Sequence, residues 1–141
     1  MPTLFTKIIN GELPGRFVWK DDKAVAFLTI APIAPGHTLV VPRAEIDHWI
    51  DMPADLAQHL ILVQQAVGQA IQKAFDPARV GVMVAGLEVP HVHYHLLPIH
   101  AIADLDFKKQ NPNEDPQEMD AAAEKIRAAL RELGHGAHVA A

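Results

Sequence analysis

The order of hydrophobic patterns along this 141-residue chain predicts an α+β fold, with a meandering antiparallel sheet of about five strands, a long central helix and a C-terminal helix. Two observations support this. Short apolar runs rich in β-branched and aromatic residues follow one another between polar turns, and two longer segments have apolar residues at helical spacing. We expect the helices to pack on one face of the sheet. We expect a single domain over residues 1–141, because half of the residues are apolar.

The first part of the chain contains the signals of a short helix followed by three strands. Residues 3–10 predict a helix that ends at Gly11, because glycine readily takes the left-handed conformation at a helix end. Residues 16–19 and 24–30 predict a hairpin around a charged four-residue turn. A Pro-Gly turn then precedes a short strand at residues 39–41.

The longest helical pattern covers residues 51–75. Asp51 is the expected N-cap, and a proline follows in the first turn. The apolar residues that define the inward face are Leu56, Leu60, Val63, Val67 and Ile71. This segment is the predicted central helix.

The second half of the chain predicts two more strands and the last helix. Residues 79–85 and 88–97 are strand-like, and we expect them to be antiparallel neighbours with a tight connection near Gly86. The C-terminal helix is expected at about residues 116–133, with Asp115 as its N-cap. Its apolar stripe is Met119, Ile126, Leu130 and Leu133, and the tail at 134–141 is expected to be frayed.

Composition excludes several classes of function. The chain has no cysteine, which rules out disulfides, thiolate metal ligands and a cysteine nucleophile. A formal charge of −5 without a basic run argues against binding to nucleic acid. The first residues lack the pattern of a signal peptide, and no apolar stretch has membrane-spanning length. We therefore expect a protein of the cytoplasm without nucleic-acid or membrane partners.

The segment VPHVHYHLLPIH, residues 89–100, places three histidines at two-residue spacing. Alternate side chains of a strand share a face, so His91, His93 and His95 are expected on one side, with neighbours ~6.6 Å apart. Zinc–nitrogen bonds are only about 2.0–2.1 Å, so all three would struggle to converge on one metal. Adjacent histidines could still share an ion with help from elsewhere.

Catalysis suits such a row better. Imidazole has an ordinary pKa of about 6.5, so one ring can act as an uncharged nucleophile while a neighbour donates a hydrogen bond or a proton. This favours phosphoryl or nucleotidyl transfer, in which imidazole attacks phosphorus. His37 follows a Pro-Gly turn at the start of another strand, where it could meet the row. Two alternatives stay open, namely an ordinary half-exposed polar strand and a metal hydrolase that uses His91 with His93 or His95.

The motif HVHYHLL at residues 91–97 resembles the signature of the histidine triad (HIT) family, and the likeness extends over a core region of roughly residues 4–98. The resemblance implies a HIT-like fold and a homodimer that binds a purine nucleotide or a derivative of one. For its Hint-like branch it implies a hydrolase or transferase that acts without a cofactor on nucleoside 5′-phosphate derivatives, such as phosphoramidates.

The resemblance also implies roles for individual residues. His93 would form a nucleotidyl-histidine intermediate, His95 would contact the α-phosphate, and His91 and His37 would complete the histidine cluster. The nucleotide-binding residues that it implies are Phe5, Ile8, Phe27, Thr29, Ile30 and Glu88. For the apolar members of this set, ordinary core packing is the alternative.

Several positions depart from the family pattern. Thr29 stands where many members have an aspartate for the ribose hydroxyls, Leu87 stands where glutamine is usual, and a loop asparagine is missing. Glu88 introduces a carboxylate near the expected phosphate, which it would repel unless it is protonated or turned away. These departures motivate an alternative function, a catalytically degenerate nucleotide-binding or protein-interaction module.

Some relatives hold a structural zinc, and the corresponding positions here also differ. They are Thr3, Thr6 and Glu45, which leaves only His91 as a usual zinc ligand. We therefore predict no metal site.

Overall fold

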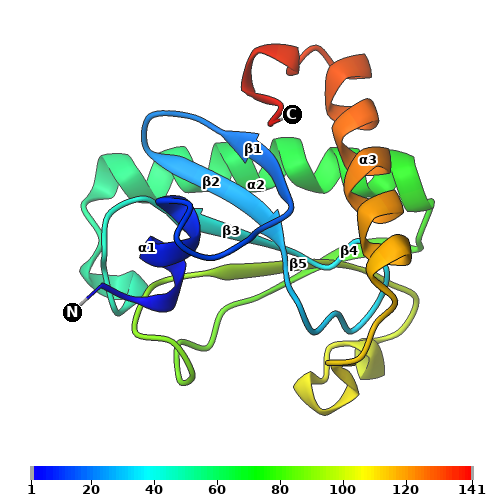
Figure 1. Cartoon of the computed structure of the whole chain (residues 1–141), viewed down its shortest axis with the longest axis horizontal. Coiled ribbons are helices and arrows are strands. Elements are labelled where there is room, and N and C mark those ends of the chain that lie inside the picture. The colour runs from blue at the N-terminus through cyan, green and yellow to red at the C-terminus, as the bar shows by residue number, and fades with distance from the viewer. Residues whose placement is uncertain (1, 141) are drawn as a thin grey trace.

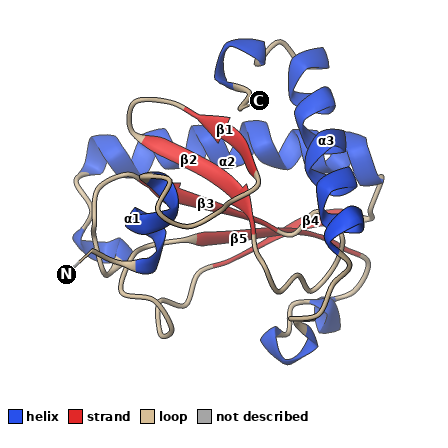
Figure 2. Cartoon of the chain, viewed as in Figure 1, coloured by secondary structure: helices blue, strands red, loops and turns tan. Residues whose placement is uncertain are grey.

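A five-stranded antiparallel sheet forms the centre of the computed structural model, which describes residues 2–140 (Figures 1 and 2). The strand order is β1-β2-β3-β5-β4. The strands are β1 (Phe17–Lys20), β2 (Ala24–Leu28), β3 (Thr38–Pro42), β4 (Arg79–Met83) and β5 (Tyr94–Ile99). The predicted α+β class is therefore confirmed, although β5 lies between β3 and β4.

Helices cover both faces of the sheet. The long helix α2 (Ala54–Phe75) lies behind the sheet in Figure 1, and α3 (Pro116–Glu132) crosses the end of α2 at the right. Both helices contribute to the same core cluster. The short helix α1 (Leu4–Ile9) packs on the opposite face through Phe5 and Ile8. The expectation that all helices share one face was wrong, because the segments around β2 and β3 are apolar on both sides and need a cover on each.

The alternation of side chains along β2 and β3 divides the core in two. Ala26 and Val40 pack in the cluster with α2 and α3, whereas Phe27 and Leu39 pack with α1. Every residue of both strands is buried. These central strands hold the elements on the two faces in fixed positions.

The connection between β4 and β5 is longer than predicted. The two strands are antiparallel neighbours, with Met83 opposite His95, as expected. Residues 84–93, however, form a loop rather than a tight turn at Gly86. The prediction of a short hairpin was therefore wrong, and two of the three histidines of the motif lie in this loop.

The helix starts were predicted with mixed success. Asp51 belongs to a 3₁₀ helix (Trp49–Asp51), and α2 begins only after Pro53, which has no side chain able to cap it. Asp51 is therefore not the N-cap of α2. Asp115 does cap α3, since its carboxylate accepts a hydrogen bond from the backbone N–H of Gln117 at 2.9 Å. Leu133, predicted to face inward, is exposed just past the end of α3.

The C-terminal tail is ordered against β1, so the expectation of a frayed tail was wrong for residues 134–140. A 3₁₀ helix (Gly136–His138) stacks the His138 ring on the indole of Trp19, at 4.7 Å between ring centroids. The backbone N–H of Ala140 donates to the carbonyl of Val18. Residue 141 lies outside the described residues.

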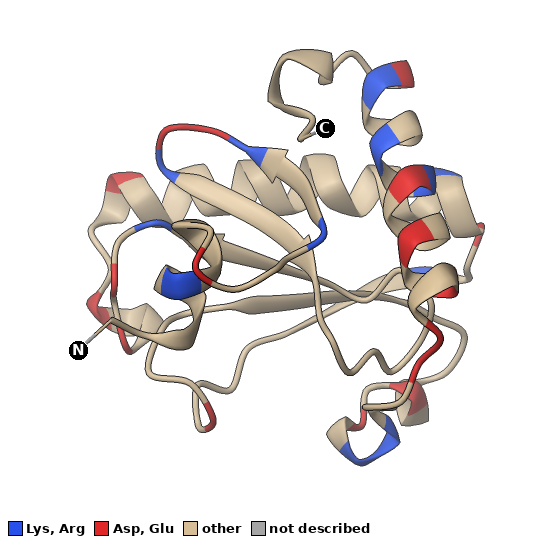
Figure 3. Cartoon of the chain, viewed as in Figure 1, with Lys and Arg blue, Asp and Glu red and all other residues tan. Residues whose placement is uncertain are grey.

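Charged residues lie mainly in loops and on α3, whereas most of the sheet is uncharged (Figure 3). In the part of the chain that the structure describes, no helix is both long enough and apolar enough to cross a membrane.

Gly36 gives a test of the packing beneath His37. Its φ is +93°, and an added Cβ would lie 2.5 Å from the ring of Phe75. We expect Gly36→Ala to lower the free energy of unfolding by about 2–4 kcal/mol, from left-handed strain and overpacking together. Gly86→Ala is the matched control, because Gly86 also has a positive φ but has nothing within 4 Å of the added atom. Urea unfolding curves measure both, and equal losses would contradict the overlap with Phe75.

Candidate active site

The three histidines keep a common face although only His95 lies within a strand. His91 and His93 precede β5 in the loop that follows β4, and the segment is held by a 2.7 Å hydrogen bond from the N–H of Val92 to the carbonyl of Ile46. Val92 is buried in the cluster under α2, whereas the histidines point to the face that α1 covers. The period of two therefore predicted the common face correctly without a regular ladder.

His91 is locked by partners on both ring nitrogens. Its Nε2 lies 2.7 Å from the carbonyl oxygen of Pro42, which can only accept, so Nε2 carries the proton. Nδ1 then accepts a hydrogen bond from the Thr3 hydroxyl, also at 2.7 Å. His91 is fully buried and has no free nitrogen for a metal or a substrate.

His93 has one nitrogen engaged and one free. Nδ1 lies 2.8 Å from the carbonyl oxygen of His91 and must donate to it. In neutral imidazole this leaves a lone pair on Nε2, and within residues 2–140 no group makes a hydrogen bond to that atom. The ring of Phe5 contacts His93 edge-on at 4.8 Å between centroids, which fixes its plane.

His37 and His95 form the second half of the cluster. The backbone N–H of Ile33 donates to Nδ1 of His37 at 3.0 Å, so the proton of His37 is on Nε2. That proton is donated to Nδ1 of His95 at 2.9 Å. The Nε2–H of His95 is then left as a donor beside the lone pair of His93, whose ring centroid lies 4.9 Å away.

Burial keeps all four rings uncharged at neutral pH. Burial lowers the pKa of His37 to about 4 and, together with the neighbouring rings of His37 and His93, that of His95 to about 3. Burial also lowers the pKa of His91 and of His93, although the negative charge of Glu88 raises the pKa of His93 in part. The cluster therefore provides one neutral ring with a free lone pair, His93, and one neutral donor, His95.

His93 and His95 line a cavity of about 750 Å³. This volume falls within the range of pockets that bind small molecules. The sequence-predicted nucleotide-binding residues all line the same cavity, namely Phe5, Ile8, Phe27, Thr29, Ile30 and Glu88. His37 does not line it and acts through His95.

Among the cavity residues that the sequence reasoning missed are three polar side chains, and a fourth missed residue is an aromatic side chain beside His95. Arg16, Gln110 and Asp120 also line the cavity, and Arg16 bonds Asp120 at 2.7 Å. Phe107 contacts the ring of His95 edge-on at 4.8 Å between centroids. Three of the four follow the motif in regions where no sequence pattern indicates proximity to it, so the only available signal was their polar or aromatic character.

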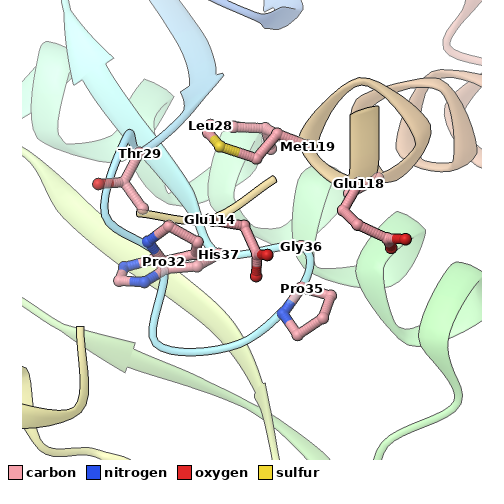
Figure 4. A pocket seen from close by; sticks show the side chains of 10 residues that line it. Leu28, Thr29, Pro32, Pro35, Gly36, His37, Glu114, Glu118 and Met119 are labelled. Atoms are coloured by element: carbon pink, nitrogen blue, oxygen red, sulfur yellow. The ribbon is translucent and has the colours of Figure 1, made fainter. Parts of the chain in front are cut away.

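A second cavity of about 20 Å³ lies behind His37, between the loop at residues 32–37 and the start of α3 (Figure 4). It has room for about one water molecule and is too small for a nucleotide. Its walls show that α3 packs across this loop through Met119, beside Leu28. The C-terminal helix therefore supports the backbone that positions His37.

The positions that correspond to a zinc site in some relatives are occupied by a hydrogen-bonded cluster. The backbone N–H of Thr3 donates to Glu45 at 2.8 Å, and the hydroxyl of Thr3 donates to His91. Hydrogen bonds from Thr6 and Thr3 also lower the pKa of Glu45. Two hydroxyls and a histidine with no free nitrogen do not fit zinc. Within residues 2–140 no group of three or more His, Cys, Asp or Glu residues is placed to hold a metal ion.

The fold and the site together define a histidine triad protein. The family model of the HIT domain matches residues 10–102, and the chain belongs to this family. Its triad is His91, His93 and His95, as the motif predicted.

Three relatives illustrate the similarity. An uncharacterized HIT-like protein of Methanocaldococcus jannaschii is 40% identical over 99 residues, which cover 67% of this chain and 77% of the relative. The purine nucleoside phosphoramidase of Escherichia coli is 37% identical over 101 residues, 67% of this chain and 85% of that enzyme. The crystal structure of a hypothetical histidine triad nucleotide-binding protein from Sulfolobus tokodaii superposes with a TM-score of 0.80, at 27% identity and 92% coverage of each chain.

The neutral cluster makes a prediction about stability and pH. The unfolded chain protonates its histidines near pH 6.5, whereas the folded chain protonates His37 only near pH 4 and His95 only near pH 3. Below about pH 6.5 the unfolded state binds more protons, so the free energy of unfolding should fall between about pH 7 and pH 5. His37→Gln should reduce this slope, and His48→Gln, an exposed histidine outside the cluster, should not. Urea titrations measure the slopes, and an unchanged slope in His37→Gln would contradict the prediction.

Proposed function

We propose that this protein is a nucleotide hydrolase or transferase that acts on nucleoside 5′-phosphate derivatives, such as phosphoramidates, through a nucleotidyl-histidine intermediate at His93. One observation supports this most directly. Nδ1 of His93 carries the proton and donates it to the carbonyl of His91, so the lone pair of Nε2 has no partner among residues 2–140. This atom lies beside a cavity large enough for a nucleotide. The Escherichia coli relative is named a purine nucleoside phosphoramidase, which supports the same chemistry and a purine base.

In the first step, Nε2 of His93 attacks phosphorus and forms a P–N bond, and the bond from phosphorus to the leaving amine breaks. The amine leaves with a proton taken from solvent. The ring of His93 becomes positively charged, and its Nδ1–H points at the carbonyl of His91, which stabilises that charge. The Nε2–H of His95 donates to a non-bridging oxygen of the phosphate.

In the second step, water attacks phosphorus and the bond to His93 breaks. Water gives one proton to solvent, which balances the proton that left with the amine. His93 returns to its starting tautomer because the carbonyl of His91 still accepts from Nδ1. An alcohol or a second phosphate in place of water would make the reaction a transfer rather than a hydrolysis.

The apolar side of the cavity suits a purine base. Phe5 and Phe27 pack edge-on against each other at 5.7 Å between centroids, and Ile8 and Leu39 complete the surface beside them. This surface lies on the α1 side of the sheet, next to His93. A base bound there would leave its phosphate near the histidines.

A second candidate function is nucleotide binding without turnover. Thr29 has no carboxylate for the sugar hydroxyls, and its own hydroxyl already accepts from the N–H of Ala31 at 3.2 Å. Leu87 is 93% exposed and does not line the cavity. Both departures weaken contacts to the substrate and leave the triad intact.

Replacement of the nucleophile separates the two candidates. Wild-type protein should release AMP from an adenosine 5′-phosphoramidate, and His93→Ala should reduce kcat/KM by at least about a thousandfold because the P–N bond can no longer form. The control is His48→Ala, which removes an exposed imidazole outside the cluster. Liquid chromatography of released AMP measures the rates, and equal turnover by wild type and His93→Ala would overturn the mechanism.

Thermal-shift titration with AMP and GMP completes this test. Specific binding raises the unfolding temperature by mass action. Binding by a wild-type protein that turns over no phosphoramidate would favour the second candidate, and turnover lost in His93→Ala would favour the first.

We also propose that two copies pair through the edge of β4. Val82 points to the face of α2 because it is opposite Leu96, yet it is 50% exposed. On α2, Gly68 faces Val80 and Leu96, so Ile61, two turns earlier, points toward the same edge while being 60% exposed.

A polar atom nearby supports the same pairing. Nε2 of Gln64 is buried and lacks a hydrogen-bond partner among residues 2–140. Gln64 lies one turn before Gly68 and therefore shares its side of α2. A two-fold related copy would cover the apolar edge, pair the free backbone groups of β4 and offer Gln64 a partner.

The oligomeric state tests this pairing. Wild-type protein should sediment as a dimer, and Val82→Lys should shift it to monomer because a charge would be buried at the strand edge. Leu62→Lys is the control, since Leu62 is 63% exposed but lines a cleft with Trp19 and His135 on the other side of α2. A monomeric wild type, or a Val82→Lys variant that stays dimeric, would contradict the β4 interface.

A further inference from the structure

The cavity beside His93 contains one negative charge without a counter-charge. Its charged lining residues are Arg16, Glu88 and Asp120. Arg16 and Asp120 bond each other at 2.7 Å and neutralise each other. Glu88 makes no ion pair and no side-chain hydrogen bond with any other residue in the range 2–140. The net charge of the lining is therefore negative while the histidines are neutral.

Glu88 lies close enough to the triad to influence the reaction. Burial lowers the pKa of His93, and the charge of Glu88 acts against this effect through space. Glu88 belongs to the loop at residues 84–93 that leads into the triad, and this loop carries no Lys or Arg (Figure 3). The field of Glu88 at the reacting centre is therefore not cancelled from its own loop.

An anionic phosphate in this cavity would meet a repulsive field. A nucleoside 5′-phosphoramidate with one ester bond and one P–N bond carries one negative charge on its non-bridging oxygens, and the neutral rings of His93 and His95 offer no positive charge in return. The formal charge of the whole chain, −5, adds to the repulsion. A positive charge on the substrate itself would reverse the interaction with Glu88.

The leaving group is the part of the substrate that can carry this charge. The base is expected on the apolar surface of Phe5 and Phe27, where a cation would lose its hydration without a partner. Glu88 is exposed at the rim of the cavity, where a charged group stays partly hydrated. An amine released toward solvent fits that rim.

We propose that Glu88 selects leaving groups with a positive charge, so that the preferred substrates are nucleoside 5′-phosphoramidates of amines that carry a second, protonated amino group. This inference rests on the proposed hydrolase activity. The chemical steps stay those at His93: the P–N bond to the leaving amine breaks as the bond to Nε2 forms. The second amino group keeps its proton throughout and takes no part in bond making.

The test compares two adenosine 5′-phosphoramidates of nearly equal length, one made from 1,5-diaminopentane and one from hexylamine. Wild-type protein should prefer the diamine substrate in kcat/KM by about threefold to fivefold, the range expected for an exposed ion pair. Glu88→Gln, which keeps the shape and removes the charge, should bring the ratio near one. The preference of the wild type should also decrease as salt is added.

Asp22→Asn is the matched control. Asp22 is an exposed carboxylate in the turn between β1 and β2 and does not line the cavity, so its removal changes the net charge by the same amount. It should keep the wild-type preference. A preference that persists in Glu88→Gln, or that is lost equally in Asp22→Asn, would overturn the role of Glu88.

The outcomes also separate this inference from the proposed function. Turnover of both substrates by wild type at equal rates would leave the hydrolase intact and overturn the selection by Glu88. Failure of wild type to turn over either substrate would overturn both.

Discussion

The hydrogen bond from Nδ1 of His93 to the carbonyl of His91 is the interaction on which the site depends. Imidazole carries a single proton when it is neutral, so a fixed donor at Nδ1 means a fixed lone pair at Nε2. Two further hydrogen bonds hold the backbone of residues 91–93 in place for this bond. The N–H of Val92 reaches the loop carbonyl of Ile46, and the ring of His91 reaches the carbonyl of Pro42 at the end of β3. The sheet therefore sets the proton positions of the site.

Two separate chains of hydrogen bonds end at the histidine triad. One runs from Glu45 through Thr3 to His91 and ties the start of α1 to the triad. The other runs from the N–H of Ile33 through His37 to His95. The first chain holds His91, whose backbone carbonyl accepts from Nδ1 of His93 and so leaves an acceptor at Nε2 of His93. The second chain leaves a donor on His95, so the two rings that line the cavity have complementary roles. Burial maintains this arrangement, because a protonated ring would break one chain or the other.

Local patterns predicted the parts of the molecule that depend on local geometry. The spacing of His91, His93 and His95 gave their common face, and the apolar runs gave the strands and the two long helices. The Pro-Gly turn before His37 correctly indicated a residue that meets the histidine row. Contacts between segments that are distant in the sequence could not be predicted from local patterns. The stacking of His138 on Trp19, the Arg16–Asp120 pair and the placement of Phe107 on His95 all join residues whose spacing in the sequence carries no signal. The start of α2 was misjudged because Asp51 has the chemistry of a cap, whereas the 3₁₀ turn that contains it was not foreseen.

Some residues of the cavity fix the tautomer of His93, and others form the lining without affecting that tautomer. His93 and the hydrogen bonds that fix its tautomer come from the loop between β4 and β5, from Pro42 in β3 and from Ile46, so a change there would disturb the proton position on His93. Asp120 comes from α3 and Gln110 from the segment before it, both beyond the region matched by the family model. Among residues 2–140, the side chain of Gln110 bonds the carbonyl of Ala31 at 3.0 Å, the side chain of Asp120 bonds Arg16, and neither side chain makes a hydrogen bond to a histidine. Replacing either residue would therefore alter the shape or charge of the cavity while the hydrogen bond that fixes the proton of His93 stayed the same. The C-terminal segments can therefore alter the lining of the cavity independently of the tautomer of His93.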